Sequence, residues 1–417
     1  MAARSPRKLA LIALQQWQRN RGFADVVLAQ LLDSTDLPKP DRAFTTELFY
    51  GILRNISLLD FWIDALRSRH LDPAARDLLR LGLYQLFLLE TPEHAAVYET
   101  VACAPIKVRP LINALLRNAI GRKSELCATA EKQPLTIRYS QPQFLIERWT
   151  KNFGPSPAMA LCEWNNRPAL IFARINRLML SVQEFFAKHD NAEAVPQHEN
   201  FVRFTSLPTE ALAAGDCYIQ DPSTVAACNL LAPVAGEKVL DACAAPGGKT
   251  GYLAELMKNQ GTLIACDRDA ARIGMLERNL RRLGIEIAEV VRHDWTSGNR
   301  LPSSLEGSGF DRILVDAPCS NTGVLRRRVD LRWRLNPEDF ERMQAEQLRM
   351  LRATIPLLRT GGLLVYSTCS IEPEENEEVV EAIRREFSGL NVVAQELLLP
   401  FRDKFDGAFA TALRRTA

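Results

Sequence analysis

Two cysteines stand where chemistry is expected, each directly after an apolar run rich in β-branched residues. Cys319 follows Asp316 in the stretch 316–320, and Cys369 lies in the stretch 366–370. Methylation at carbon-5 of a pyrimidine requires a thiol, because that carbon becomes enamine-like only after a thiolate adds to carbon-6. An electrophilic methyl group is then captured, and a base removes the C5 proton so that the cysteine leaves. The two motifs therefore indicate thiol chemistry on a nucleobase.

A glycine-rich turn upstream indicates a nucleotide-type cofactor. It contains Gly247, Gly248 and Lys249, follows a predicted strand and opens a predicted helix, whose free N–H groups suit a ligand. Asp267 ends the next predicted strand, and a carboxylate at this spacing suits the hydroxyls of a ribose. Asp294, after the third strand, is a candidate for an adenine amine, with a surface-loop aspartate as the alternative. The turn lacks the pattern of a dinucleotide site.

A thiol nucleophile needs nearby positive charge. With a pKa of about 8.5, a free thiol is only a few per cent ionised at neutral pH. Lys249 and a basic run after Cys319 supply cations that could lower a thiol pKa or bind phosphates, and a solvated basic loop is the alternative. The run contains Arg326, Arg327, Arg328, Arg332 and Arg334.

The other cysteines and an acidic run are expected to be structural. Cys243 should pack under the cofactor, and the remaining cysteines should be small buried residues. The acidic residues of 372–378 should mostly complement a helix dipole. The cysteines expected to be buried are Cys103, Cys127, Cys162, Cys217, Cys228 and Cys266.

The elements that must position these residues alternate between strand and helix from about residue 220 onward. Strands are predicted at 238–241, 262–266, 288–291, 310–315 and 363–366, and helices at 250–258, 270–283 and 337–358. Repeated strand–helix units predict a doubly wound, mostly parallel sheet, in which ligands bind beyond the carboxyl ends of the strands. Every residue that looks chemical lies at such an end.

The first part of the chain has a different pattern. Residues 1–130 show helical spacing throughout, including 41–66, 72–89 and 111–120. Residues 131–220 are mixed, with short helices, a strand at 170–175 and a helix at 182–188. We therefore expect three domains: a helical domain (1–130), a connector with a small α/β subdomain (131–220) and a catalytic domain (221–417).

Composition sets the remaining limits. The 417 residues are 47% hydrophobic and 24% charged with a net charge of +2, so nucleic-acid binding must come from local patches. The nine scattered cysteines, with no Cys-x-x-Cys pair, argue against disulfides or a metal site and favour a reducing cytoplasm. We expect no signal peptide and no membrane-spanning stretch.

At its motifs the sequence resembles the bacterial RNA cytosine-5 methyltransferases of the Sun/Fmu family. The matching motifs occur in the family's order and spacing. They are Cys243-Ala244-Ala245-Pro246-Gly247-Gly248-Lys249, Asp316-Ala317-Pro318-Cys319-Ser320, Tyr366-Ser367-Thr368-Cys369-Ser370 and Pro373-Glu374-Glu375-Asn376-Glu377. The N-terminal part, for example Pro92-Glu93-His94-Ala95-Ala96-Val97 and Asn113-Ala114-Leu115-Leu116-Arg117, resembles the NusB-type helical RNA-binding domain.

The resemblance implies a class I, Rossmann-like methyltransferase domain that uses S-adenosylmethionine, preceded by an all-α NusB-like domain and the small α/β connector. It implies that Cys369 is the nucleophile and that Cys319 assists product release. It assigns the cofactor to the stretch 243–249 with Asp267, Asp294 and Asp316, and places Asp316 close to the target base as well.

The NusB-like domain is typical of the family's 16S ribosomal RNA member. The expected substrate is therefore 16S rRNA, free or partly assembled, without DNA or membrane partners, and we expect a cytoplasmic monomer. The same chemistry on tRNA or large-subunit rRNA, and a non-catalytic RNA-binding factor, are the alternatives. Asn321, Val329 and Ala408 depart from the family pattern, which has glycine, proline and phenylalanine there, and leave the fine substrate preference open.

Overall fold

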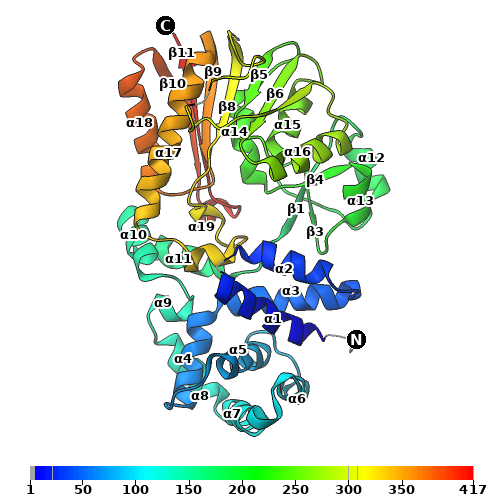
Figure 1. Cartoon of the computed structure of the whole chain (residues 1–417), viewed down its shortest axis with the longest axis vertical. Coiled ribbons are helices and arrows are strands. Elements are labelled where there is room, and N and C mark those ends of the chain that lie inside the picture. Colours follow the sequence, from blue (N-terminus) through cyan, green and yellow to red (C-terminus); the bar gives the residue numbers. More distant parts are fainter. Residues whose placement is uncertain (1–4, 21, 299, 308, 417) are drawn as a thin grey trace. The chain divides into compact units, whose positions relative to one another are not determined.

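The computed structural model describes residues 5–20, 22–298, 300–307 and 309–416. Their packing forms two compact units (Figure 1). Unit 1 holds the described residues up to Arg167 together with Leu325–Arg334, and unit 2 holds Pro168–Val324 and the residues from Leu335 onward. The division into three domains stays a prediction. Within the described part of the chain, no helix is both long and apolar enough to cross a membrane.

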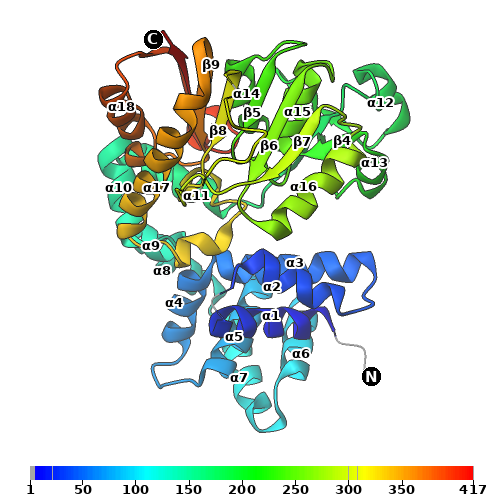
Figure 2. The same ribbon diagram turned by 45° about the horizontal axis from the view of Figure 1, so that its top comes forward.

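Unit 1 is helical, as its spacing predicted. Asp72 caps α5 by accepting hydrogen bonds from the N–H groups of Ala74 and Ala75, and Pro73 occupies the first helical position. Helices α1 and α3 pack against each other over a core of leucine and phenylalanine side chains (Figure 2). The α-helices are α1 (Pro6–Asn20), α2 (Ala24–Asp33), α3 (Lys39–Arg54), α4 (Ile56–Leu66), α5 (Pro73–Phe87), α6 (Glu93–Cys103), α7 (Arg109–Gly121), α8 (Lys123–Glu131), α9 (Leu135–Arg138), α10 (Gln143–Phe153) and α11 (Pro155–Asn166), with the 3-10 turns η1 (Ile106–Val108) and η4 (Val329–Trp333).

The helical pattern expected over 41–66 is interrupted. Asn55 leaves helical geometry with φ −125° and ψ 21°, which separates α3 from α4. Its side-chain amide donates to the Gly51 carbonyl at 2.9 Å and its N–H to the Ile52 carbonyl at 3.0 Å. Asparagine competes for backbone hydrogen bonds in this way and therefore ends helices well.

Unit 2 is built on a seven-stranded sheet in the order β10-β11-β9-β8-β5-β6-β7. The five strands from β9 to β7 are parallel, whereas β10 and β11 pair antiparallel at one edge. The mostly parallel sheet is confirmed, and the antiparallel edge was not predicted. The strands are β5 (Lys238–Asp241), β6 (Thr262–Asp267), β7 (Ala288–Arg292), β8 (Phe310–Asp316), β9 (Leu358–Thr368), β10 (Leu390–Leu398) and β11 (Ala408–Arg415).

Helices cover both faces of this sheet. Alternate strand residues divide between the faces: Ile264 packs with α17 and α18, while Leu263 packs with α14 and α15. Helix α16 packs on Ala265, on the same side as α14 and α15. The helices are α14 (Ala226–Leu231), α15 (Gly248–Leu256), α16 (Ala270–Arg282), α17 (Glu338–Thr354), α18 (Glu377–Glu386) and α19 (Pro400–Asp403), with the 3-10 turns η2 (Pro222–Val225), η3 (Thr322–Val324), η5 (Ile355–Leu357) and η6 (Pro373–Glu375).

The prediction of one helix over 337–358 was wrong at its end. Helix α17 stops at Thr354, and Leu358 already begins β9. Proline disfavours helical geometry in the residue before it and lacks an N–H donor, so Pro356 confines Ile355–Leu357 to a single 3-10 turn.

A smaller antiparallel sheet, in the order β2-β3-β1-β4, also belongs to unit 2. The predicted strand and helix of this region are confirmed as β1 (Ile171–Ile175) and α12 (Val182–Lys188). Ser181 and Glu184 form a reciprocal capping box at the start of α12. The other elements are β2 (Glu193–Ala194), β3 (Phe201–Phe204), β4 (Cys217–Ile219) and α13 (Thr209–Ala214).

Candidate active site

The structure brings the two candidate cysteines together. Strands β8 and β9 are parallel neighbours with Asp316 opposite Ser367, so the loops that follow them leave the same edge of the sheet. The sulfur atoms of Cys319 and Cys369 lie 3.1 Å apart, within hydrogen-bonding distance. Cys319 is buried, whereas Cys369 is partly exposed. The expectation that the chemically interesting residues lie at the carboxyl ends of strands is therefore confirmed for both cysteines.

The Cys319 thiol does not ionise readily. The hydrogen bond to Cys369, together with burial, raises the pKa of the Cys319 thiol well above its ordinary value. Glu375 adds to this effect, because its negative charge also disfavours a thiolate at Cys319. Cys319 therefore keeps its proton at neutral pH and presents an S–H donor to the sulfur of Cys369.

Glu375 ties the two cysteine loops together. Its carboxylate accepts a hydrogen bond from the Ser320 N–H at 2.8 Å, another from the Ser320 hydroxyl, and one from the Ser370 hydroxyl at 2.7 Å. Ser320 follows Cys319 and Ser370 follows Cys369. Burial raises the pKa of Glu375. This positioning role was missed, because an acidic run reads as solvated; the helix-dipole expectation fits Glu377 and Glu378, which lie in the first turn of α18.

Two glycines let the backbone segments at the site approach closely. A Cβ atom added to Gly323 would lie 2.7 Å from the Cys369 carbonyl oxygen and 2.7 Å from that of Gly407. The Gly323 N–H donates to the Cys369 carbonyl, and the Gly407 N–H donates to the Gly323 carbonyl. The loop after Cys319 is therefore held directly against the loop that carries Cys369. Ala408, a departure from the family pattern, begins β11 beside this contact.

Lys249 and Asp316 form an ion pair next to the cysteines. The Lys249 ammonium lies 2.7 Å from one carboxylate oxygen of Asp316, and the Ser367 hydroxyl donates to the other at 2.8 Å. Burial disfavours the ammonium, but the Asp316 charge outweighs it and raises the pKa of Lys249. Lys249 also interacts electrostatically with Cys369. A permanent cation thus stands near the exposed thiol, as expected.

Two arginines of the basic run after Cys319 are buried within unit 1. Arg332 is 1% exposed and donates to the side-chain oxygen of Asn166 at 2.7 Å and to the carbonyl of Asn165 at 2.8 Å, all within unit 1. The Arg326 guanidinium is buried and stacks 4.0 Å from the ring centre of Trp164. Because both side chains are buried, phosphate binding and the solvated-loop alternative were wrong for these two arginines, whereas a role in thiol activation stays a prediction. Val329 is buried in the core of unit 1.

A cavity of about 110 Å³ lies beside the glycine turn and is lined by two of the three candidate cofactor aspartates, Asp267 and Asp294 but not Asp316. Asp267 is buried, and its carboxylate accepts hydrogen bonds from the N–H groups of Ala245 at 3.3 Å and Asp269 at 3.0 Å. Asp294 accepts from the N–H and hydroxyl of Thr296, bonds that lower its pKa. The lining residues are Ala242, Cys243, Asp267, Arg268, Arg272, His293, Asp294, Trp295, Thr296, Pro318 and Met350.

The residues of the glycine turn beside this cavity are held in place by contacts with neighbouring elements. Ala244 and Ala245 are buried and pack on Leu276 of α16, while the Pro246 carbonyl accepts from the Asn279 amide at 2.8 Å. Gly247 has φ +107°, a conformation that other residues rarely adopt. An added Cβ at Gly248 would lie 2.7 Å from the Tyr218 ring. The carboxylates, the open backbone and the small residues fit a ribose and an adenine.

Asp241, at the end of β5, was overlooked as a site residue. It is fully buried and accepts a hydrogen bond from the Thr250 hydroxyl at 2.7 Å. Burial raises the pKa of Asp241 to about 7. Its position at the end of the predicted strand 238–241 was the available signal, because a carboxylate is rarely fully buried unless it is paired.

The remaining cysteines agree in part with expectation. Cys162, Cys217, Cys228 and Cys266 are buried, and burial raises their pKa values. Cys243 lines the cavity, as predicted. Cys103 and Cys127 are only partly buried and pack at the edge of the unit 1 core. Among the described residues, no group of three or more histidine, cysteine or carboxylate side chains is arranged to hold a metal ion.

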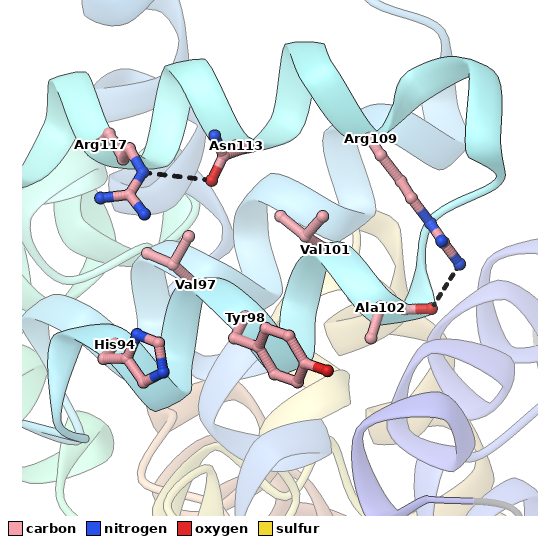
Figure 3. A pocket seen from close by; sticks show the side chains of 8 residues that line it. All are labelled: His94, Val97, Tyr98, Val101, Ala102, Arg109, Asn113 and Arg117. Atoms are coloured by element: carbon pink, nitrogen blue, oxygen red, sulfur yellow. Dashed lines mark hydrogen bonds between the residues drawn. The ribbon is translucent and has the colours of Figure 1, made fainter.

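Unit 1 carries a groove between α6 and α7, shown in Figure 3. Its volume is about 210 Å³, and it combines an exposed tyrosine, Tyr98, with the exposed Arg109 and Arg117. Tyr98 stacks on His94 with ring centres 6.1 Å apart, and Arg117 donates to the Asn113 side chain. An exposed aromatic ring beside two cations suits an unpaired base and its phosphates.

Three known families match successive parts of the chain. The NusB family matches residues 4–121, the ferredoxin-like domain of RsmF/B-like methyltransferases matches residues 141–202, and the family described as 16S rRNA methyltransferase RsmB/F matches residues 228–413. Ribosomal RNA small subunit methyltransferase B of Escherichia coli (strain K12) is 38% identical over 358 residues, which cover 82% of this chain and 81% of that protein.

Two crystal structures are similar in fold. The structure of PH0851 covers 98% of this chain and 99% of its own, with 24% identity and a TM-score of 0.78. A methyltransferase homolog from Pyrococcus horikoshii covers 67% of this chain and 97% of its own, with 28% identity and a TM-score of 0.59. The expected fold class, a helical NusB-type domain and a Rossmann-like methyltransferase domain, is confirmed.

Proposed function

Because the chain belongs to the 16S rRNA methyltransferase RsmB/F family, whose cofactor is S-adenosylmethionine, we propose that it methylates carbon-5 of a cytosine in 16S rRNA through a covalent bond to Cys369. The observation that carries this proposal is the pair of sulfurs 3.1 Å apart at the ends of β8 and β9. Two adjacent thiols beside a cation are suited to covalent chemistry on a base, whereas transfer to an oxygen or an exocyclic nitrogen needs no thiol.

Cys369 is the proposed nucleophile, since it is the more exposed thiol and has Lys249 near it. Its sulfur adds to carbon-6 of the cytosine, and the electron pair of the 5,6 double bond moves to carbon-5, which then accepts the methyl group. Loss of the C5 proton to a base re-forms the double bond as the carbon–sulfur bond breaks. Cys319 assists this last step, because its S–H donates to the departing thiolate.

Asp316 is proposed to contact the target base as well as the cofactor. Lys249 and Ser367 hold both of its carboxylate oxygens, so its position is defined before the base arrives. The base must leave its stack to reach this position, which costs a few kcal/mol and least in a loop. An unpaired or looped cytosine is therefore the favoured target.

When bound, S-adenosylmethionine supplies the methyl group as an electrophile. We propose that Asp267 binds the ribose hydroxyls and Asp294 the adenine amine, since both line the cavity beside the turn. The backbone of 243–249 borders the rest of the ligand. The Ala245 and Asp269 N–H groups fix the Asp267 carboxylate, and Arg272 lies 3.5 Å from one of its oxygens; a carboxylate offers about four acceptor sites, so it can also accept from a ribose.

The helical unit is proposed to bind rRNA without taking part in the chemistry. The groove of Figure 3 supplies an aromatic surface and two exposed arginines for this purpose. Arg54 of α3 is not available for phosphate binding, because it is only 6% exposed. We propose free or partly assembled 16S rRNA as the substrate, and a monomer acting in the cytoplasm.

Bisulfite mapping of rRNA from a strain lacking the gene tests the proposal. One cytosine of 16S rRNA should lose its methyl group and regain it when the wild-type gene is returned. Cys369→Ser should not restore it, although this variant keeps the size of the side chain. A missing methyl group in tRNA or large-subunit rRNA would favour the first alternative, and an unchanged pattern in all RNAs would favour a non-catalytic binding factor.

A further inference from the structure

Asn321, two residues after Cys319, has a backbone conformation that few residue types adopt. Its φ is +61°, the left-handed conformation that glycine, asparagine and aspartate tolerate best. Glycine, which is usual at this position in the family that the sequence resembles, adopts the left-handed conformation without a side chain. The asparagine therefore supplies an amide that the backbone conformation itself does not need.

The Asn321 amide contacts both cysteines. Its Nδ2 donates to the backbone carbonyl of Cys319 at 2.7 Å, and its Oδ1 lies 3.0 Å from the sulfur of Cys369. Rotating the amide by half a turn would place Oδ1 against the Cys319 carbonyl oxygen, two acceptors facing each other. The contact with Cys319 thus determines which atom faces Cys369, and that atom is an acceptor.

An acceptor at this position favours the protonated form of Cys369. The S–H of Cys369 donates to Oδ1, whereas a thiolate would face an oxygen that carries partial negative charge. Among the described residues, the charged or titratable groups shown near this sulfur include Cys319 after β8 and Lys249 of α15, while Asp316 pairs with Lys249 and Glu375 of η6 acts on Cys319. Lys249 favours the thiolate, and Asn321 opposes it.

We propose that Asn321 is a positioning residue that aims the Cys369 sulfur and restrains its ionisation. The thiol proton is held between the sulfur of Cys369 and Oδ1 of Asn321. A nucleophile restrained in this way is protected from oxidation and alkylation while the enzyme waits for its substrate. The proposal rests on the role of Cys369 proposed above, but the state of the thiol is measurable without RNA.

The test is the rate at which Cys369 is carbamidomethylated by iodoacetamide in the full-length protein, followed by mass spectrometry of the cysteine-containing peptide from pH 6 to 10. Asn321→Gly keeps the backbone conformation and removes the acceptor, so alkylation at pH 7 should become about threefold faster or more, as expected for a lost hydrogen bond. Asn321→Asp keeps the acceptor and adds a negative charge, so alkylation should become slower.

Opposite shifts in the two variants distinguish this role from simple loosening of the loop, which would change both rates in the same direction. Lys404→Gly is the matched control, because Lys404 is also left-handed, with φ +64°, and lies in unit 2 outside the site. Unchanged rates, or shifts in one direction, would overturn the proposal. If the wild-type protein does not methylate rRNA, the proposed function is wrong, but the alkylation result still tests the role of Asn321.

Discussion

The sulfurs of Cys319 and Cys369 lie 3.1 Å apart, and the burial and charge around them keep the proton on Cys319. This asymmetry assigns different tasks to two residues that look alike in the sequence. Cys369→Ala should therefore abolish both methylation and any covalent RNA adduct. Cys319→Ala should accumulate an adduct that survives denaturing electrophoresis, because the departing thiolate has lost its donor. An adduct with Cys369→Ala and none with Cys319→Ala would reverse the roles.

Asp267 is expected to contribute to cofactor affinity. Hydrogen bonds to a charged group are worth roughly 1.5–3 kcal/mol, so Asp267→Asn should weaken S-adenosylmethionine binding about tenfold or more in calorimetry. Asp269→Ser is the control: Asp269 accepts from the N–H groups of Ala271 and Arg272 at the start of α16, a cap that serine also provides. Equal affinities for the two variants would remove Asp267 from the proposed site.

Glu375 should be required for the arrangement of the cysteine loops. Glu375→Gln replaces an oxygen that accepts from Ser320 by an amide N–H, so two donors face each other inside a buried network. We expect a loss of roughly 1–3 kcal/mol in unfolding free energy and a large fall in methylation. Glu378→Gln, an exposed neighbour in α18, should change neither quantity in chemical denaturation and activity assays.

Asp241 should make stability depend on pH. Its pKa is about 7 in the folded protein and about 3.9 in an unfolded chain, so the folded state holds the proton more tightly. The stability contributed by this proton is complete below pH 4 and is lost as the pH rises to 7. Asp241→Asn carries no such proton and should gain stability relative to the wild type as the pH rises, by at most about 4 kcal/mol.

Urea unfolding at pH 5 and pH 8 measures this difference. The advantage of Asp241→Asn should be clearly larger at pH 8, while Asp190→Asn, at an exposed position, should behave like the wild type at both values. A constant offset at the two pH values would mean that the Asp241 carboxyl is ionised in the folded protein throughout this range.

The groove of unit 1 should add RNA affinity without affecting the cofactor. Tyr98→Ala should cost about 1–3 kcal/mol of rRNA binding if one base stacks there, and Arg117→Ala should lower the slope of log affinity against log salt by about one. Both variants should bind S-adenosylmethionine normally. Arg385→Ala, an exposed arginine of α18, is the control. Unchanged affinity and slope in both groove variants would remove this surface from the rRNA interface.

Single substitutions test rRNA binding by the groove better than removal of the helical domain does. Removing the first 140 residues would break two hydrogen bonds of the segment Leu325–Arg334. Asp330 would lose the bond that it accepts from the Ala24 N–H, and Trp333 would lose the bond that it donates to the Leu53 carbonyl. The segment Leu325–Arg334 would then expose buried groups, and any loss of activity could come from its collapse.

Local sequence patterns were sufficient to predict much of the fold and part of the candidate site. The alternation of strands and helices predicted the parallel sheet, and the position of Cys319 and Cys369 after strands predicted that they would meet. Both predictions depend on a general rule, that parallel strands end at one edge, and need no knowledge of individual contacts. The glycine turn with Asp267 was recognisable for the same reason.

The features that could not be predicted depend on contacts between residues far apart in the sequence. Arg332 was a candidate for thiol activation or phosphate binding and Glu375 for complementing a helix dipole, yet one is buried among the carbonyls of unit 1 and the other joins two loops at the active site. Asn321 read only as a departure from a family pattern. The sequence by itself determined which chemical groups are available and along which edge they lie. Which charges are buried, and which atom faces the Cys369 sulfur, depended on contacts between segments far apart in the sequence, because desolvation and hydrogen bonding act through space and leave no local periodicity.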